Sequence, residues 1–155
     1  MGLRVTTEQT LKRTPLYAAH QKLGARLVEF GGWEMPVQYT SIVDEHQSVR
    51  AAAGIFDISH MGEVFVSGPA ALDFLNATLT NDLRKCEVGR GQYTLLCNDC
   101  GGVIDDLYVY HIEELGYLLV VNASRVADDV RWFESSCFPS SGATSLVKFA
   151  ANCGP

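Results

Sequence analysis

The sequence predicts an α+β fold in which helices pack on an antiparallel sheet. Three strand-like segments follow one another in the second half of the chain, at 93–97, 103–111 and 117–122. The connections between them are short, and short connections join antiparallel strands, whereas parallel strands need a long crossover. Helix-like segments lie before and after this group instead of alternating with each strand, which favours α+β over a doubly wound sheet.

The first half of the chain is predicted to mix three helices with three strands. Thr14 offers a capping hydroxyl ahead of a proline, so a first helix is expected to begin there and to end at Gly24. Ser41 is expected to cap a second helix, and a third is expected after Gly68. The strands are predicted at 25–30, 55–59 and 63–67.

A fourth helix is expected after the three strands. Ser124 is its predicted cap, and Val126, Val130 and Phe133 recur at helical spacing as its apolar face. A loop is predicted at 139–142, and 146–150 could add one more strand.

The composition is that of a globular protein. Hydrophobic residues make up 47% of the 155 residues and charged residues 19%. The net charge is −6 and no run of Lys or Arg forms a basic stripe, so no nucleic-acid partner is expected. No apolar run approaches the roughly 20 residues of a membrane span, and residues 1–12 hold no apolar signal segment. We therefore expect a bacterial-type cytoplasmic protein with no membrane association and no signal or transit peptide.

The five cysteines are predicted to be free thiols, since their number is odd. Cys97 and Cys100 form a single CxxC pair, which makes a poor zinc site without a second pair. A redox pair would open a helix, but this one leads into two glycines and indicates a turn between strands. No metal site is expected.

Two neighbouring carboxylates in the strand 103–111 are the main candidates for chemistry. Side chains alternate along a strand, so Asp105 and Asp106 point to opposite faces and are not an acid pair of the glycosidase kind. Asp105 is expected to accept backbone N–H groups near the Gly101-Gly102 turn. Asp106 shares its face with Tyr108 and Tyr110, where a flat heterocycle could stack. The alternative is that Asp106 is an ordinary hydrogen-bonded sheet carboxylate.

A second candidate cluster lies at 56–63, where a predicted strand runs into polar residues and a glycine. Binding residues often lie at such places. The alternative is a capped turn with His60 as a hydrogen-bonding partner. The chain shows no Ser-His-Asp order, no metal-ligand spacing and no nucleotide-binding glycine motif.

These segments resemble the T-protein family of the glycine cleavage system. The resemblance is carried by Arg13-Thr14-Pro15-Leu16-Tyr17, by 24–36, by Tyr39-Thr40-Ser41-Ile42, by 54–63, by Thr80-Asn81-Asp82, by 101–107 and by Val120-Val121-Asn122-Ala123. Several motifs in the family's order, from about residue 13 to about residue 133, make the match specific.

The resemblance implies the first part of a three-domain enzyme built around a central folate site. Residues 1–12 would be an extension, 13–135 the N-terminal part of the aminomethyltransferase folate-binding region, and 136–155 a divergent tail of a truncated chain. The family transfers the aminomethyl carbon from the dihydrolipoyl arm of H-protein to tetrahydrofolate, which gives 5,10-methylenetetrahydrofolate and ammonia. The expected partners are therefore lipoylated H-protein and tetrahydrofolate as co-substrate.

By position in the family's motifs, Asp106 resembles the essential acid near the reactive nitrogens of the folate. The residues that resemble the pterin site are Met61, Tyr93, Val120, Val121 and Asn122.

Other functions remain open for a chain that resembles this family. One is a non-enzymatic folate-binding protein of the iron–sulfur cluster maturation type, whose KGCYxGQE-type signature does not occur in these 155 residues. Another is the folate domain of a related demethylase or oxidase. The match at 101–107 favours the transferase. Since family members are much longer, the isolated chain is expected to be inactive.

Overall fold

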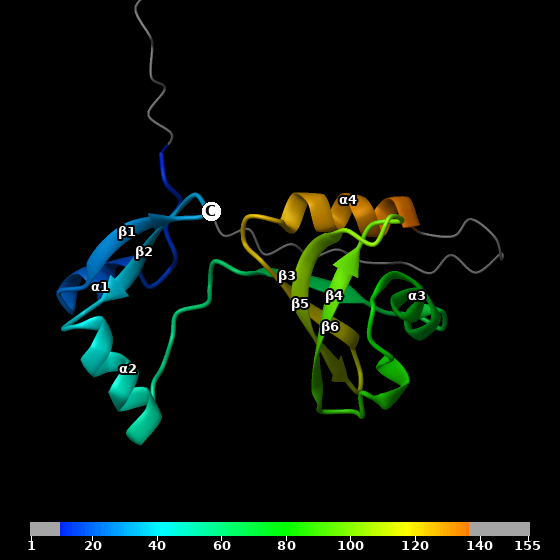
Figure 1. Ribbon diagram of the computed structural model, residues 1–155, viewed down its shortest axis with the longest axis horizontal. Coiled ribbons are helices and arrows are strands. Elements are labelled where there is room, and N and C mark those ends of the chain that lie inside the picture. Colours follow the sequence, from blue (N-terminus) through cyan, green and yellow to red (C-terminus); the bar gives the residue numbers. More distant parts are fainter. Residues whose placement is uncertain (1–9, 137–155) are drawn as a thin grey trace, which may run out of the picture. The chain divides into compact units, whose positions relative to one another are not determined.

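The computed structural model describes residues 10–136 of the chain (Figure 1). It confirms the α+β class: helices are combined with two antiparallel sheets, one of two strands and one of four. The chain divides into two compact units between His60 and Met61. The predicted loop at 139–142 and the possible strand at 146–150 lie outside the described residues.

The first unit is a small α+β module built around one hairpin. Its elements are α1 (Tyr17–Lys22), β1 (Arg26–Phe30), β2 (Trp33–Gln38) and α2 (Ile42–Ala51). The two strands pair antiparallel, and Trp33 and Met35 of β2 are buried. Ser41 caps α2 as predicted, because its hydroxyl oxygen accepts from the backbone N–H of Asp44 at 3.1 Å. Gly24 follows α1 with a φ of 76°, which a glycine adopts readily.

Three expectations for this unit are wrong. Thr14 does not cap α1, which has no side-chain cap; its hydroxyl donates instead to Asp57 at 2.7 Å. Strand β2 was not predicted; it contains Pro36, which is tolerated because a two-stranded sheet has only edge strands. Segment 55–59 is not a strand, since no segment within residues 10–136 pairs with it and Ile55 is 99% exposed.

The second unit contains the larger sheet and two covering helices. Its elements are β3 (Gly62–Val66), α3 (Ala71–Thr78), the 3-10 helix η1 (Leu83–Lys85), β4 (Gly91–Cys97), β5 (Val103–Ile112), β6 (Gly116–Val121) and α4 (Val126–Ser136). The sheet order is β3-β6-β5-β4 and every pairing is antiparallel. The predicted meander is confirmed. The pairing of β3 with β6 joins segments that are far apart in the sequence, so local patterns could not predict it.

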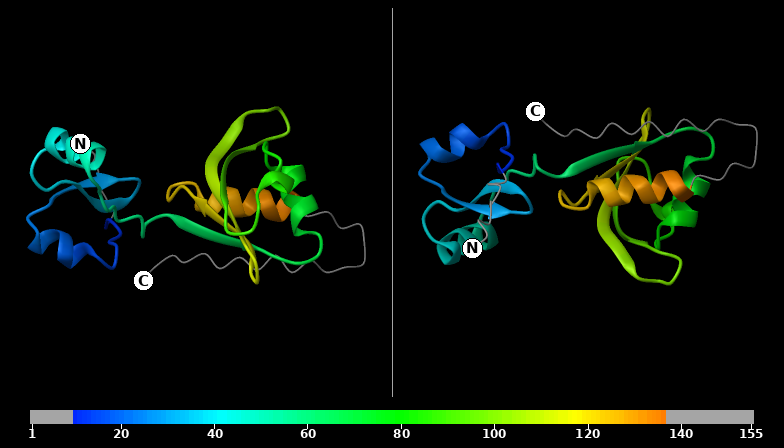
Figure 2. Two further views of the ribbon diagram at one scale, coloured as in Figure 1. Left: turned by 90° about the horizontal axis from the view of Figure 1, so that it is seen from below. Right: turned by 90° about the horizontal axis from the view of Figure 1, so that it is seen from above.

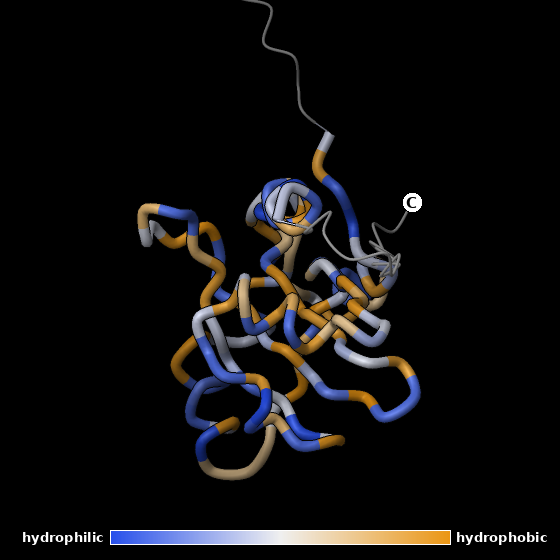
Figure 3. Tube along the Cα trace, turned by 90° about the vertical axis from the view of Figure 1, so that its right-hand side faces the viewer, coloured by the Kyte–Doolittle hydropathy of each residue, from blue (hydrophilic) through white to orange (hydrophobic). Residues whose placement is uncertain are grey.

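Only one face of this sheet carries the hydrophobic core. Val64, Val109 and Leu119 point to that face and are fully buried against Leu75 of α3 and Phe133 of α4. Figure 2 shows α4 running along the sheet, and hydrophobic and hydrophilic residues alternate along much of the trace in Figure 3. Burial of each such side chain is worth roughly 1.5–3 kcal/mol. The core therefore fixes which residues point to the opposite face, here called the outer face.

The turn between β4 and β5 is built by Asn98. Its side-chain oxygen accepts from the backbone N–H of Cys100 at 3.0 Å and of Gly102 at 2.8 Å. Cys97 and Cys100 flank this turn as free thiols, which confirms a turn instead of a helix start, and Cys86 is free as well. Cys137 and Cys153 lie outside the described residues. Within residues 10–136, no helix combines the length and hydrophobicity that a membrane span requires.

Candidate functional site

Strand β5 sends its two carboxylates to opposite sides of the sheet, as predicted. Asp105 is 5% exposed and lies on the core face with Leu107 and Val109. Asp106 is exposed on the outer face with Tyr108 and Tyr110. Packing of the core decides this separation, because a one-residue slip of β5 would bury Asp106 and expose its apolar neighbours.

The carboxylate of Asp106 is held from both neighbouring strands. The hydroxyl of Tyr93 on β4 donates to its Oδ2 at 3.0 Å. The side-chain amide of Asn122, directly after β6, donates to its Oδ1 at 3.2 Å and to its backbone oxygen at 3.0 Å. The hydrogen bond to Asp106, together with desolvation and the charge of that carboxylate, raises the pKa of Tyr93, so the phenol remains a neutral donor.

Three tyrosines continue from this carboxylate along the outer face; we call Tyr93, Tyr108 and Tyr110 the tyrosine row. Their ring centroids lie 6.3 Å and 5.4 Å apart in succession, and the residues are 51%, 43% and 41% exposed. Gly91 leaves them room, since a Cβ there would lie 2.7 Å from the ring of Tyr110. The row offers an aromatic surface next to an oriented negative charge. Gly91 was not among the predicted site residues, although its position opposite Tyr110 in the meander could have indicated it.

Of the remaining predicted site residues, Val120 and Met61 lie near Asp106 and Asn122 in the sheet, whereas Val121 is part of the core. Val120 pairs with Tyr108 on the outer face, and Met61 directly precedes β3, whose Gly62 pairs with Val121 next to Asn122. Val121 itself is fully buried in the core. Its side chain therefore cannot meet a ligand that lies over Asp106, and only its main chain is available there.

Asp105 is satisfied differently from the prediction. Its Oδ2 accepts from the backbone N–H of Asn122 at 3.0 Å, and its Oδ1 from the side-chain amide of the same residue at 2.9 Å. The expected donors in the 101–102 turn are already bound to Asn98. Asn122 thus contacts both carboxylates and connects the core face to the outer face.

Comparison with known proteins decides the family. Residues 16–150 match the family described as "GCVT N-terminal domain". Curated proteins named aminomethyltransferase are 55% identical over 128 residues in Symbiobacterium thermophilum and 53% identical over 131 residues in Desulforamulus reducens. The chain belongs to the glycine cleavage T-protein family.

Structural comparison agrees. The crystal structure of glycine cleavage system aminomethyltransferase T from Bartonella henselae matches 84% of this chain with a TM-score of 0.78 and 39% identity. The chain spans only about a third of its T-protein relatives, 34% of the Symbiobacterium protein, 36% of the Desulforamulus protein and 36% of the Bartonella chain.

The second predicted cluster of this T-protein family member is a buried structural network. Asp57 accepts from Thr14 at 2.7 Å, from His20 at 2.8 Å and from the backbone N–H of Ser59 at 2.9 Å. Desolvation acts to raise the pKa of Asp57, but these hydrogen bonds outweigh it and hold the pKa below its usual range. His60 does not join them; its ring lies against Phe30 and Trp33. The expectation that His60 is a hydrogen-bonding partner is therefore not met.

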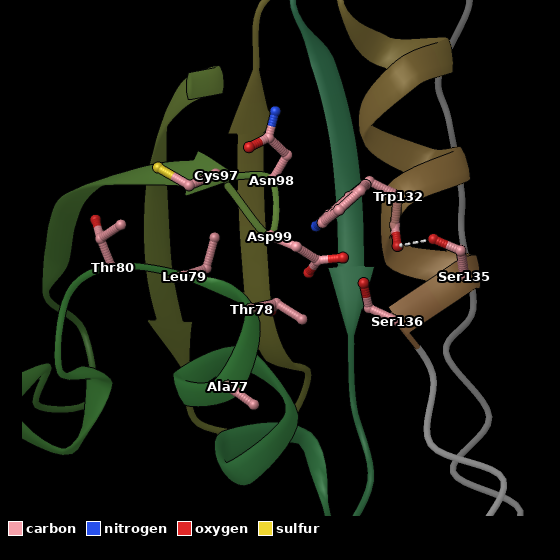
Figure 4. A pocket seen from close by; sticks show the side chains of 10 residues that line it. All are labelled: Ala77, Thr78, Leu79, Thr80, Cys97, Asn98, Asp99, Trp132, Ser135 and Ser136. Atoms are coloured by element: carbon pink, nitrogen blue, oxygen red, sulfur yellow. Dashed lines mark hydrogen bonds between the residues drawn. The ribbon is translucent and has the colours of Figure 1, made fainter. Parts of the chain in front are cut away.

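A pocket of the T-protein fold lies on the helix-covered side of the sheet (Figure 4). The ends of α3 and α4 and the β4–β5 turn line it, with Thr80, Asp99 and Trp132 among its residues. None of the residues predicted to bind folate lines this pocket. Among the described residues, no group of three or more His, Cys, Asp or Glu side chains is arranged to hold a metal ion.

Proposed function

We propose that this chain supplies one side of the tetrahydrofolate site of an aminomethyltransferase in glycine cleavage. The reaction transfers the aminomethyl carbon from the dihydrolipoyl arm of H-protein to tetrahydrofolate and gives 5,10-methylenetetrahydrofolate and ammonia. The relatives carry this name, and the chain spans about a third of their length. In this proposal residues 13–135 form the first part of the folate-binding region, between an extension at 1–12 and a tail at 136–155.

The observation that supports this function best is the carboxylate of Asp106 beside the tyrosine row. A pterin is a flat heterocycle with N–H donors along its edge. An aromatic surface suits its faces, and a carboxylate suits its donors. Asp106 is held in place by Tyr93 and Asn122 before any ligand binds. Such preorganisation lowers the cost of orienting a bound partner.

The same geometry suits the transfer step. In the transfer the carbon–nitrogen bond of the aminomethyl group breaks with loss of ammonia, the carbon–sulfur bond breaks to leave the thiol of the reduced arm, and two folate nitrogens bind the carbon in exchange for their protons. Positive charge develops on the one-carbon unit before a folate nitrogen attacks it. A fixed carboxylate beside that nitrogen orients it and stabilises the charge. Asp106 need not remove a proton to do so. Its two hydrogen-bond donors, Tyr93 and Asn122, hold the carboxyl group in a fixed orientation for this role.

The partners of the reaction belong to the proposal as well. Lipoylated H-protein would deliver the one-carbon unit, and the remaining length of the family's chain would enclose the folate. Since the tyrosine row is 41–51% exposed, one face of a sheet cannot keep water from the reacting atoms. We therefore expect little aminomethyl transfer by residues 1–155 alone. A cytoplasmic location stays a prediction.

The test replaces Asp106 in a full-length context. Residues 13–133 are grafted into the Symbiobacterium thermophilum relative, and transfer from aminomethylated H-protein to tetrahydrofolate is measured. Asp106→Asn keeps the size of the side chain and removes its charge, so we expect turnover to fall by roughly 10²-fold or more. Asp99→Asn removes a charge from the exposed β4–β5 turn and is the matched control, with unchanged turnover.

Two results would contradict the proposal. The first is an Asp106→Asn graft as active as its parent. The second is a folded parent graft that binds tetrahydrofolate but transfers nothing, which would favour the non-enzymatic folate-binding alternative.

A further inference from the structure

The core of the second unit contains one acid that the proposed reaction does not use. Asp129 of α4 is fully buried, and neither of its side-chain oxygens meets a hydrogen-bond donor among residues 10–136. On the same helix, Phe133 is buried in the core, and Val126 and Val130 are partly buried against it. A buried polar group without a partner costs free energy, and a buried unpaired charge costs far more. The state of this acid therefore needs an explanation.

The charged groups that face Asp129 are Asp105 on β5, Arg125 directly before α4, and Asp128 on α4 itself. The cation is already engaged: Arg125 donates to the backbone oxygen of Ile104 at 3.0 Å and pairs with Asp128 at 2.8 Å. Desolvation, and next the charge of Asp105, raise the pKa of Asp129 to about 8. Ionised, Asp129 would be a second buried negative charge beside Asp105.

A proton resolves this conflict. Two carboxylates can only accept hydrogen bonds, whereas a protonated carboxyl group also donates one. Asp105 accepts one hydrogen bond from Asn122 on each oxygen, and each oxygen keeps a free lone pair. A protonated Asp129 beside it finds an acceptor, and the pair then carries one negative charge in place of two.

We propose that Asp129 is a neutral acid that donates a hydrogen bond to Asp105 and acts as a positioning residue for Asn122 and Asp106. The connection runs from Asp129 to Asp105, from Asp105 to the side-chain amide of Asn122, and from that amide to Asp106. The last link has a catalytic meaning only if the proposed function of Asp106 is right. The buried proton itself does not depend on folate.

The proposal predicts a pH response that passes through the core. As pH rises through the pKa of Asp129, the hydrogen bond to Asp105 is lost and two negative charges face each other. Asp105 then shifts relative to Asn122. The chemical shift of the Asn122 side-chain amide, which also contacts Asp106 on the outer face, should change as a result. In the folded chain, the side-chain amide of Asn122 should titrate together with Asp129.

The experiment is NMR of residues 1–155 without ligand, between pH 5 and pH 9. The carboxyl carbon of Asp129 is followed together with the side-chain amide of Asn122. We expect both to change with one midpoint, near pH 8. Asp129→Asn keeps a donor toward Asp105 and cannot lose a proton, so the Asn122 titration should vanish while its resonances stay at the wild-type positions of pH 5.

Two further variants complete the test. Asp129→Ala removes the donor and should shift the Asn122 and Tyr93 resonances at every pH. Asp128→Asn, a change of the same kind at a more exposed position of α4, should leave the Asn122 titration in place. An Asp129 that titrates in the ordinary carboxyl range, or an Asn122 titration that persists in Asp129→Asn, would overturn the proposal. Because no folate is present, these results are independent of the test of Asp106.

Discussion

Asp105 and Asp106 are chemically identical neighbours with different surroundings. The alternation of β5 places one in the core and the other on the outer face, and Asn122 binds both. The sequence pattern was enough to predict this separation. It was not enough to predict the donor of Asp105, because Asn122 is 17 residues away and meets it only when β6 pairs with β5.

A substitution of Asp105 should therefore affect stability more than chemistry. Asp105→Asn keeps one acceptor oxygen and turns the other into a donor, so one of the two Asn122 groups loses its partner. We expect a loss of about 1–3 kcal/mol in the free energy of unfolding. Urea denaturation followed by Trp132 fluorescence in a Trp33→Phe background measures it. An unchanged unfolding midpoint would show that the Asn122 contacts contribute nothing.

The buried position of Asp129 was not predicted, although the sequence contained a signal for it. Val126, Val130 and Phe133 were assigned to the apolar face of a helix, and Asp129 lies within the same stripe at helical spacing. An acid in such a stripe is a signal for a buried, paired or neutral carboxyl group. Only the structure shows that Asp105 is its neighbour.

At the scale of elements, the β4–β5 turn depends on one side chain and not on its cysteines. Asn98→Ala removes the acceptor for two backbone N–H groups and should lower stability by about 0.5–1.5 kcal/mol, since water can reach this exposed turn. The Cys97→Ser, Cys100→Ser double variant is the control and should leave the thermal midpoint unchanged. Destabilisation by the cysteine variant alone would assign the turn's stability to the thiols.

The network around Asp57 makes the stability of the first unit dependent on pH. The pKa of Asp57 is lower in the folded state than in the unfolded chain, so the carboxylate stabilises the fold above its unfolded pKa of about 4. This contribution is lost as pH falls from that value through the folded pKa.

We therefore expect acid to destabilise the first unit, and Asp57→Asn to be less stable at pH 7 with a weaker dependence on acid. Trp33 fluorescence in a Trp132→Phe background follows this unit during unfolding. Equal acid sensitivity of wild type and variant would contradict this assignment.

The elements that sequence could predict are those defined by local pattern. The meander and the helix after Ser41 follow from alternation, short turns and a capping side chain. The errors at Thr14 and at 55–59 both depend on contacts distant in sequence: the hydroxyl of Thr14 binds Asp57, 43 residues away, and 55–59 has no strand to pair with among the described residues. Local propensity cannot register such contacts. The pairing of β3 with β6 was not predicted, because these strands are also far apart in the sequence.

For the whole molecule, the proposed function depends on which side of the sheet binds the ligand. The family and the fold are shown, but the chain spans about a third of its relatives. The outer face leaves aromatic rings exposed beside a fixed carboxylate, while the pocket in Figure 4 lies on the other side of the sheet and contains none of these groups. The proposed function requires folate on the outer face.

Titration of isotope-labelled residues 1–155 with tetrahydrofolate, kept reduced and followed by NMR, tests this claim most directly. Weak binding is expected from a single face, so millimolar ligand is used. We expect shifts of Tyr93, Tyr108 and Asn122 and no shift of Thr80 or Trp132. The response should be lost in Asp106→Asn but not in Asp99→Asn. Shifts confined to Thr80 and Trp132, or an Asp106→Asn response equal to that of the wild type, would contradict this claim.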